Sequence, residues 1–256
     1  MPIVYAHRGG AALRPENTIA AFDHGMALGA DGLEFDVHLS SDGVVVVHHD
    51  STLQRTTNGR GAVEQCTAAE LAQLDACCHF VDAGGRYPYR GSGFGIPTLR
   101  EVLRRYPHAQ LIIELKRSGS RLARAVVDEI RAAGAVDRVA VGSFHSSALQ
   151  AVRAYEPALV TGAAAIETRL ALYRSWVGWP LGRTPYREFQ VPIRSGFTPI
   201  VTRRFVNQAH RAGVQVKVWT VNTADEMRRV LAYGVDALIT DRPDLARSVL
   251  SESAAE

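Results

Sequence analysis

A histidine and an arginine stand at the end of the first apolar run of the chain. His7 and Arg8 follow the run IVYA and precede two glycines. A buried strand has no packing use for a titratable ring or a fixed positive charge. Arginine binds phosphates and carboxylates, and histidine exchanges protons near neutral pH. The pair therefore indicates either a solvated strand end or a site that binds anions.

Three carboxylates occur in two other apolar runs. Glu34 and Asp36 alternate within GLEFDV, and Glu114 and Lys116 alternate within LIIELK. Residues two apart share one face of a strand, so each pair points to one side. Converging carboxylates repel each other unless a cation lies among them, and ligands that are all oxygen favour Mg²⁺ or Ca²⁺ over zinc. With Arg8 and Lys116 beside them, the pattern predicts one divalent cation and a bound phosphate.

A hairpin is expected to return a second histidine to these carboxylates. Asp42 and Gly43 separate two extended runs in HLSSDGVVVVHHD, which is a strong signal for a tight turn. With these two residues as the turn, Asp36 pairs with His49 on the returning strand. His7 and His49 then serve as proton donor and acceptor, which is typical of metal-assisted phosphoryl chemistry.

The elements that position these residues alternate between short β-branched runs and helical patterns. We expect strands over 3–7, 32–37, 110–115, 138–144, 159–164, 188–193, 214–219 and 236–240. We expect helices over 18–29, 98–106, 119–134, 146–155, 166–177, 203–212, 224–233 and 243–251. Eight such repeats in 256 residues favour a (β/α)₈ barrel, whose catalytic residues lie where the strands end. An open, doubly wound sheet is the alternative, although no G-x-G-x-x-G motif follows the first strand.

The barrel is predicted to form a single domain over residues 1–256, with two additions. The hairpin extends the second strand past the carboxyl-terminal mouth, and residues 50–97 form a long irregular insertion. At that mouth the sixth and seventh strands add Gln190 and Trp219 as candidate substrate contacts.

Composition narrows the possible partners and setting. A hydrophobic fraction of 46% is typical of a globular protein with a sizeable core, and a net charge of +3 without a basic run argues against nucleic acid. The three cysteines lack metal-ligand spacing and include an adjacent pair, which favours a reducing compartment. Since neither a signal peptide nor a membrane span is visible, we expect a cytoplasmic protein.

Five ordered motifs resemble the glycerophosphodiester phosphodiesterase family over residues 5–244. They are AHRGG…PENT, LEFDVHLSSDGVVVVHHD, IIELK, VKVWTVN and GVDALITDRPD. The resemblance implies a (β/α)₈ barrel that hydrolyses glycerophosphodiesters to glycerol 3-phosphate and an alcohol. It implies metal ligation by Glu34, Asp36 and Glu114, acid–base catalysis by His7 and His49, and phosphate binding by Arg8 and Lys116. It also implies that the 50–97 insertion covers the barrel mouth.

Residues next to these motifs are expected to have supporting roles. We take His7 as the base and His49 as the leaving-group acid, although the pattern leaves their order open. The nucleophile is either water or the glycerol 2-hydroxyl. Asp50 is a candidate to orient His49, whereas Asp241 is expected to support the barrel mouth or cap the last helix. The PENT motif is taken as mainly structural, with Glu16 or Asn17 reaching the site as the alternative. His38 and His48 are also taken as structural.

An aromatic, basic segment follows the fifth strand. Trp176 and Trp179 lie between Arg174 and Arg183, and Tyr186 follows three residues after Arg183. They form either a helix end packed on its neighbour or an exposed lip that contacts lysolipid or a membrane surface.

Three functions other than glycerophosphodiester hydrolysis are the alternatives to this interpretation. An exposed lip would favour a lysophospholipase D. A barrel that binds phosphodiesters without cleaving them is disfavoured because all seven key positions hold chemically competent residues. A sugar-phosphate isomerase barrel would not need three carboxylates and two histidines. The oligomeric state is left open.

Overall fold

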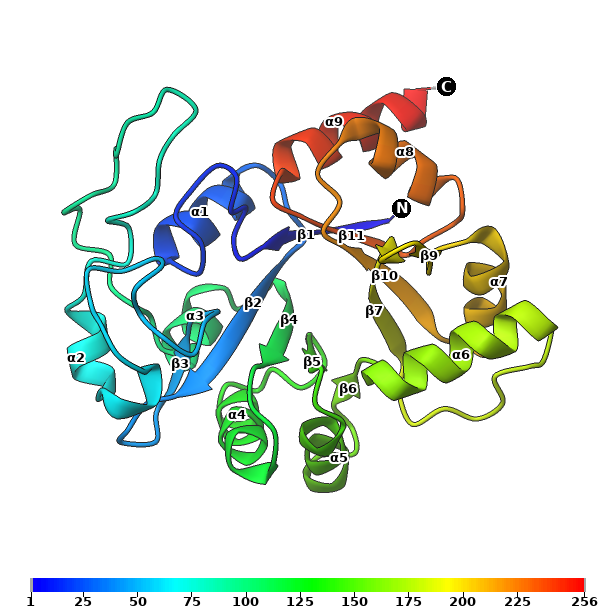
Figure 1. Cartoon of the computed structure of the whole chain (residues 1–256), viewed down its shortest axis with the longest axis horizontal. Helices are drawn as coiled ribbons and strands as arrows, with labels where there is room; N and C mark the ends of the chain where they lie inside the picture. The colour runs from blue at the N-terminus through cyan, green and yellow to red at the C-terminus, as the bar shows by residue number, and fades with distance from the viewer. Residues whose placement is uncertain (1, 256) are drawn as a thin grey trace.

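Eight parallel strands form a nearly closed barrel in the computed structural model, which describes residues 2–255 (Figure 1). In spatial order they are β6 (Val160–Thr161), β5 (Val139–Gly142), β4 (Gln110–Leu115), β2 (Gly32–Leu39), β1 (Ile3–His7), β11 (Ala237–Thr240), β10 (Gln215–Trp219) and β7 (Glu188–Pro192). Gly162 and Glu188 form an isolated parallel bridge between β6 and β7. The predicted (β/α)₈ barrel is confirmed.

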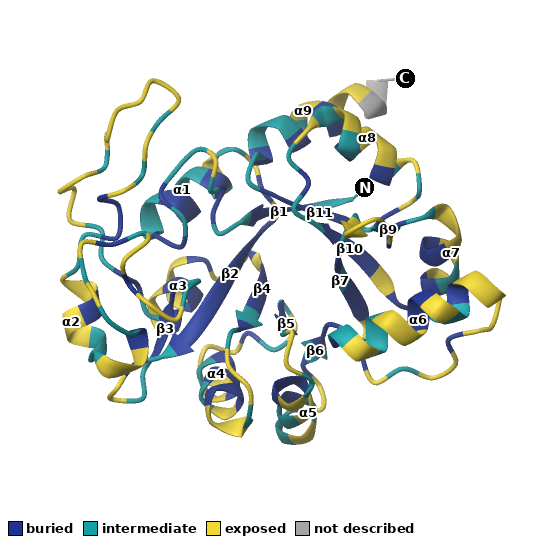
Figure 2. Cartoon of the chain, viewed as in Figure 1, coloured by how far each residue is buried: buried dark blue, intermediate teal, exposed yellow. Residues whose placement is uncertain are grey.

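Helices surround the barrel and bury their apolar faces against the strands (Figure 2). They are α1 (Ile19–Ala27), α3 (Leu99–Arg105), α4 (Ser120–Ala132), α5 (Ser146–Tyr155), α6 (Ala165–Val177), α7 (Arg203–Arg211), α8 (Ala224–Leu231) and α9 (Pro243–Ala255). Each predicted helix is present with ends shifted by a few residues. No helix among residues 2–255 is both long and apolar enough to cross a bilayer.

The predicted hairpin exists, but its register differs by one residue. Strand β3 (Val45–Val47) pairs with β2 so that Val37 lies opposite Val47. Asp36 therefore stands opposite His48, whose backbone N–H donates to the Asp36 carbonyl at 3.0 Å. The predicted pairing of Asp36 with His49 is wrong.

The Ser40 side chain explains this shift. Its hydroxyl accepts a hydrogen bond from the Val44 N–H at 2.9 Å and donates to Asp42 at 2.6 Å. Gly43 adopts φ +80°, and its N–H donates to the Ser40 carbonyl. Three residues therefore lie between Ser40 and Val44, in place of the expected two-residue turn.

Two strands are shorter than predicted by three or more residues, and one hairpin was not predicted. The strand predicted over 138–144 is the four-residue β5, and the strand predicted over 159–164 is the two-residue β6. The structure adds an antiparallel hairpin of β8 (Arg194–Ser195) and β9 (Thr198–Pro199) after β7. This hairpin and helix α6 lie on one side of the barrel (Figure 1).

The insertion over 50–97 lies on the opposite side, beside β3 and α1 (Figure 1). It contains a short 3₁₀ helix, η1 (Val63–Gln65), and helix α2 (Ala68–Ala72). A small core anchors it to the barrel: Val46, Leu53, Val63, Leu71, Ala76 and Ile96. The three cysteines, all in this segment, are free.

Candidate active site

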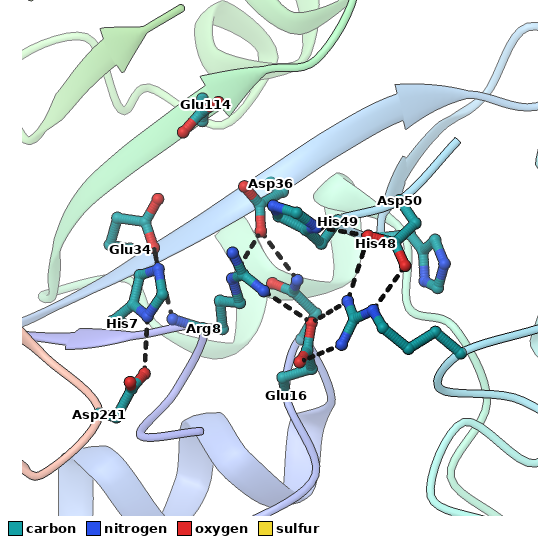
Figure 3. Close-up of polar contacts among 12 residues, drawn as sticks. His7, Arg8, Glu16, Glu34, Asp36, His48, His49, Asp50, Glu114 and Asp241 are labelled. Carbon is teal, nitrogen blue, oxygen red and sulfur yellow. Dashed lines mark hydrogen bonds and ion pairs between the residues drawn. The ribbon is translucent and has the colours of Figure 1, made fainter. Parts of the chain in front are cut away.

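Strands β2 and β4 bring the three predicted carboxylates together at the barrel mouth (Figure 3). Their parallel register places Asp36 beside Glu114, and Glu34 shares the face of Asp36. One oxygen from each side chain lies within 4.8 Å of the others. Glu34 and Asp36 are buried, so the cluster is held in a poorly solvated place.

This donor set fits a hard divalent cation. Burial raises the pKa of Glu34 to about 8, and the charges of Asp36 and Glu114 add to the rise while His7 opposes it. Ligands that are all oxygen and carry surplus negative charge suit Mg²⁺ or Ca²⁺.

The wider network also carries an excess of carboxylates. It is a connected set of hydrogen bonds and ion pairs among described residues, containing six carboxylates and three permanent cations. The carboxylates are Glu16, Glu34, Asp36, Asp50, Glu114 and Asp241, and the cations are Arg8, Arg55 and Lys116. A bound divalent cation would offset part of this charge.

Two cations face the carboxylate cluster. Lys116 Nζ lies 2.8 Å from Asp36 Oδ1 and 2.8 Å from Glu114 Oε1. Arg8 Nε lies 3.2 Å from Asp36 Oδ2. Burial alone would lower the pKa of Lys116, but the Asp36 and Glu114 carboxylates outweigh it and raise the pKa. Both cations are therefore charged and lie beside the carboxylate cluster.

The Arg8 backbone is held in an uncommon conformation. Its φ is +50°, in the left-handed region that non-glycine residues rarely occupy. The Arg8 N–H donates to the Glu34 carbonyl at 2.7 Å, and its carbonyl accepts from the Asn17 N–H. The turn after β1 thus aims the guanidinium into the mouth at some conformational cost.

His7 is held by a carboxylate from the far end of the chain. Its Nδ1 lies 2.6 Å from Asp241 Oδ1, and its Nε2 lies 3.8 Å from Glu34 Oε2. Since a carboxylate only accepts, Nδ1 carries the proton and Nε2 faces the cluster. Burial would lower the pKa of His7, but Glu34 and Asp241 together raise it.

The expectation that Asp241 only supports the mouth or caps a helix missed this contact. Strand β11 pairs with β1 so that Ala6 lies beside Thr240, and the next residues of the two strands meet at the mouth. A closed barrel places the first strand beside the last, and this neighbourhood could have predicted the contact between His7 and Asp241.

His49 has a similar arrangement on the other side of Arg8. Its Nδ1 lies 2.6 Å from Asp50 Oδ1, which confirms the expected contact with Asp50. Strand β3 ends at Val47 and the chain bends at His49, whose ring lies beside Asp36 despite the shifted register (Figure 3).

An arginine from the insertion joins this second pair to the rest of the site. Arg55 donates to Asp50 Oδ2 at 2.6 Å and to both carboxylate oxygens of Glu16 at 2.8 Å. Glu16 in turn accepts from Arg8 at 3.0 Å. Sequence reasoning missed Arg55, because no local pattern links it to residues so distant along the chain.

Two side chains of the PENT motif, Glu16 and Asn17, reach the site, which favours the alternative to a mainly structural role. Asn17 donates from Nδ2 to Asp36 Oδ2 at 3.0 Å, and its φ is +57°. Its Oδ1 is buried without a hydrogen-bond partner. Thr18 caps helix α1, because its hydroxyl accepts a hydrogen bond from the Ala21 N–H. His38 and His48 contact backbone carbonyls, in keeping with structural roles.

The comparisons with known proteins agree with this geometry. The Glycerophosphoryl diester phosphodiesterase family matches residues 7–245. A glycerophosphodiester phosphodiesterase of Caldanaerobacter subterraneus subsp. tengcongensis is 33% identical over 247 residues, covering 94% of this chain and 95% of that protein. The chain belongs to this family. The predicted enzyme class, a phosphoric diester hydrolase, is confirmed.

Solved structures of family members have the same fold. The glycerophosphoryl diester phosphodiesterase domain of a Mycobacterium tuberculosis protein superposes with a TM-score of 0.86 at 26% identity, covering 98% of this chain and 99% of that chain. An Oleispira antarctica phosphodiesterase in complex with the product sn-glycerol-3-phosphate has a TM-score of 0.79 at 28% identity, covering 98% and 97%.

In the present chain, a cavity of about 580 Å³ extends from Glu114 along the side of the mouth opposite the histidines. Gln190 and Trp219 line it, as expected of candidate substrate contacts. Gln190 donates to Glu188 at 2.6 Å, and the Trp219 ring meets Phe144 edge-on at 6.0 Å.

Gln190 needs glycine on the neighbouring strands. A Cβ on Gly142 would lie 2.2 Å from Gln190 Oε1, and one on Gly162 would lie 3.2 Å from Gln190 Cδ. The two glycines therefore leave room for this side chain inside the barrel.

The aromatic segment is exposed in part. Trp176 is 52% exposed and lines the outer end of the cavity, and Trp179 is 66% exposed beyond it. Tyr186, in contrast, is buried against Phe189 at 5.1 Å, and Arg174 donates to the Leu181 carbonyl. The lip therefore includes the two tryptophans but not the tyrosine.

Proposed function

We propose that this enzyme hydrolyses glycerophosphodiesters to glycerol 3-phosphate and an alcohol, using one divalent cation, Mg²⁺ or Ca²⁺. The observation that carries the proposal is the pair of histidines beside the three-carboxylate cluster, each with its Nδ1 on an aspartate. The related Oleispira antarctica structure, which contains glycerol 3-phosphate, supports the choice of product.

The side chains divide the work of phosphoryl transfer. Glu34, Asp36 and Glu114 would hold the cation, which would supply charge stabilisation for the phosphoryl oxygens. Arg8 and Lys116 hold the same group and orient it.

The histidines move the protons. His7 Nε2 takes the proton from the attacking oxygen, either water or the glycerol 2-hydroxyl, while Asp241 stabilises the resulting imidazolium. His49 donates its proton to the departing alcohol oxygen as the P–O bond breaks. Attack by the 2-hydroxyl gives a cyclic phosphate, which water then opens to glycerol 3-phosphate.

A lysophospholipase D is the second candidate, and the apolar cavity favours it. The cavity joins Glu114 to Tyr173 and Trp176, giving an acyl chain an apolar path away from the cluster. In this activity the same residues would cleave a lysophospholipid and release its headgroup alcohol. A peripheral contact with membranes fits this substrate, and the free cysteines fit a cytoplasmic setting.

The first experiment measures product release with and without metal. Purified enzyme is incubated with glycerophosphocholine plus Mg²⁺ or Ca²⁺, and again with excess chelator, and glycerol 3-phosphate is quantified. Lysophosphatidylcholine is run in parallel and scored by choline release. Turnover of the soluble diester that chelator abolishes and metal restores supports the main proposal.

The other outcomes are equally informative. Turnover of the lysolipid alone supports the lysophospholipase D. Full activity after chelation overturns the metal dependence. Metal binding without turnover of either diester contradicts both activities.

A further inference from the structure

Helix α6 exposes apolar residues that nothing in the structure covers. Its buried face consists of Ala171, Leu172 and Ser175. Its opposite face carries a stripe spaced four, three and four residues apart: Ile166, Leu170, Tyr173 and Val177. All four are more than half exposed, and much of the helix is drawn as exposed in Figure 2. An exposed apolar stripe of this kind is typical of a surface that binds another protein, a ligand or a membrane.

More exposed aromatic residues surround the opening of the cavity. Phe144 is 59% exposed and lines the cavity wall. Phe197 stands fully exposed at the tip of the β8–β9 hairpin, whose residues Ser195 and Thr198 also line the cavity. The exposed apolar surface is therefore continuous with the path into the active site.

The same region is strongly basic. Residues 162–213 contain eight arginines and two glutamates, whereas the rest of the chain contains 21 basic and 24 acidic residues. Both glutamates are already paired, Glu167 with Arg153 and Glu188 with Lys217. Within the described part of the chain, seven of these arginines form no side-chain hydrogen bond or ion pair: Arg169, Arg183, Arg187, Arg194, Arg203, Arg204 and Arg211.

Trp179 joins the basic and apolar parts of this surface. A groove of about 1170 Å³ beside it is lined by Arg183, Arg203 and Arg204, and none of the acidic residues within 2–255 lines it. The Trp179 carbonyl accepts a hydrogen bond from Gln208 on α7. The bulky apolar side chains thus lie next to unneutralised guanidinium groups.

We propose that this surface docks on an anionic lipid bilayer. The tryptophans and Phe197 would enter the interface, and the arginines would contact the negatively charged headgroups. A second copy of this chain fits the surface less well, because a symmetric contact would bring unpaired arginines together. The inference gives the second proposed activity a lipid surface to work on, but the binding test is independent of turnover.

Vesicle binding tests the proposal. The wild-type protein is mixed with phosphatidylcholine vesicles, either pure or containing phosphatidylglycerol, and bound protein is separated by flotation. We expect binding to the anionic vesicles, weaker binding at high salt, and little binding to the neutral ones. The three tryptophans supply a second readout, since two lie on this surface and their emission should shift to the blue.

Two variants and matched controls locate the contact. Trp179→Ala with Phe197→Ala is expected to weaken binding at least tenfold. Arg183→Gln with Arg203→Gln and Arg204→Gln is expected to weaken it roughly 100-fold, at about fivefold for each arginine. Tyr87→Ala and Arg60→Gln, on exposed residues of the insertion, should leave binding unchanged. Turnover of the soluble diester shows that each variant is folded.

Three results would overturn the proposal. One is the absence of binding to anionic vesicles, and another is binding that neither set of substitutions weakens. The third is a stable dimer in solution that the tryptophan variant dissociates and that does not bind vesicles, which would make this surface a contact between copies.

Discussion

The two halves of the barrel mouth have opposite physical characters. On the side of β1, β2 and β4, charged side chains are largely buried and held by one another. On the side of β5, β7 and α6, an apolar cavity opens among exposed aromatic rings. We infer that the first half performs the chemistry and the second selects the substrate. Changes in the first should therefore lower kcat for every diester, and changes in the second should act on one substrate class.

Removing a carboxylate from the cluster should have the largest effect. Asp36→Asn keeps the shape of the side chain but removes a charge next to the other two carboxylates. We expect cation binding to be lost and activity on both substrates to fall on the order of 10³-fold or more. Calorimetry with Mg²⁺ and Ca²⁺, together with glycerol 3-phosphate release, checks this.

The matched control is Asp137→Asn, on an exposed loop remote from the mouth. It should bind metal and turn over substrate as the wild type does. Normal metal affinity in Asp36→Asn would remove this residue from the proposed ligand set.

Loss of a proposed proton donor should lower activity somewhat less than loss of a carboxylate from the cluster. His49→Ala is expected to lower kcat by roughly 10²–10⁴-fold for both substrates, because the leaving alcohol then departs without a positioned acid. Steady-state kinetics at saturating metal measures it, with His108→Ala on an exposed loop as the control. Undiminished turnover by His49→Ala would rule out its role.

Disturbing the ion pair between the insertion and the barrel should have a smaller effect on activity still. Arg55 contacts Asp50 and Glu16 through a planar fork that lysine cannot reproduce. We expect Arg55→Lys to lower kcat by about 10- to 100-fold through misplacement of His49, with little change in KM. Arg60→Lys, in the same insertion, is the control. An Arg55→Lys variant with wild-type kcat would make this ion pair a structural feature only.

The predictable parts of the site are those set by local geometry. Glu34 and Asp36 share a face because strand side chains alternate, and this holds wherever the strand lies. Contacts made by barrel closure are harder to predict, because they join residues far apart in the sequence. His7 and Asp241, for example, are 234 positions apart. Asn17 reaches Asp36 through a positive φ, which asparagine adopts more often than most residues but which its type alone does not predict.

The hairpin and α6 show two other limits. A single hydroxyl, that of Ser40, changed the turn length and with it the register of the returning strand. In α6, apolar residues on both faces are compatible with burial, yet one face is exposed. Sequence periodicity shows that such a helix is apolar, but not which neighbours cover it.

The smallest expected effect gives the sharpest separation of the two halves. Trp176 lines the outer end of the cavity, whereas Trp179 lies outside it. We expect Trp176→Ala to raise KM for monomeric lysophosphatidylcholine by about tenfold, because an acyl chain loses an aromatic wall. Kinetics on glycerophosphocholine, which does not reach that wall, should be unchanged. Trp179→Ala should leave both monomeric substrates unaffected, and an equal loss on both substrates in Trp176→Ala would mean that the two halves do not act separately.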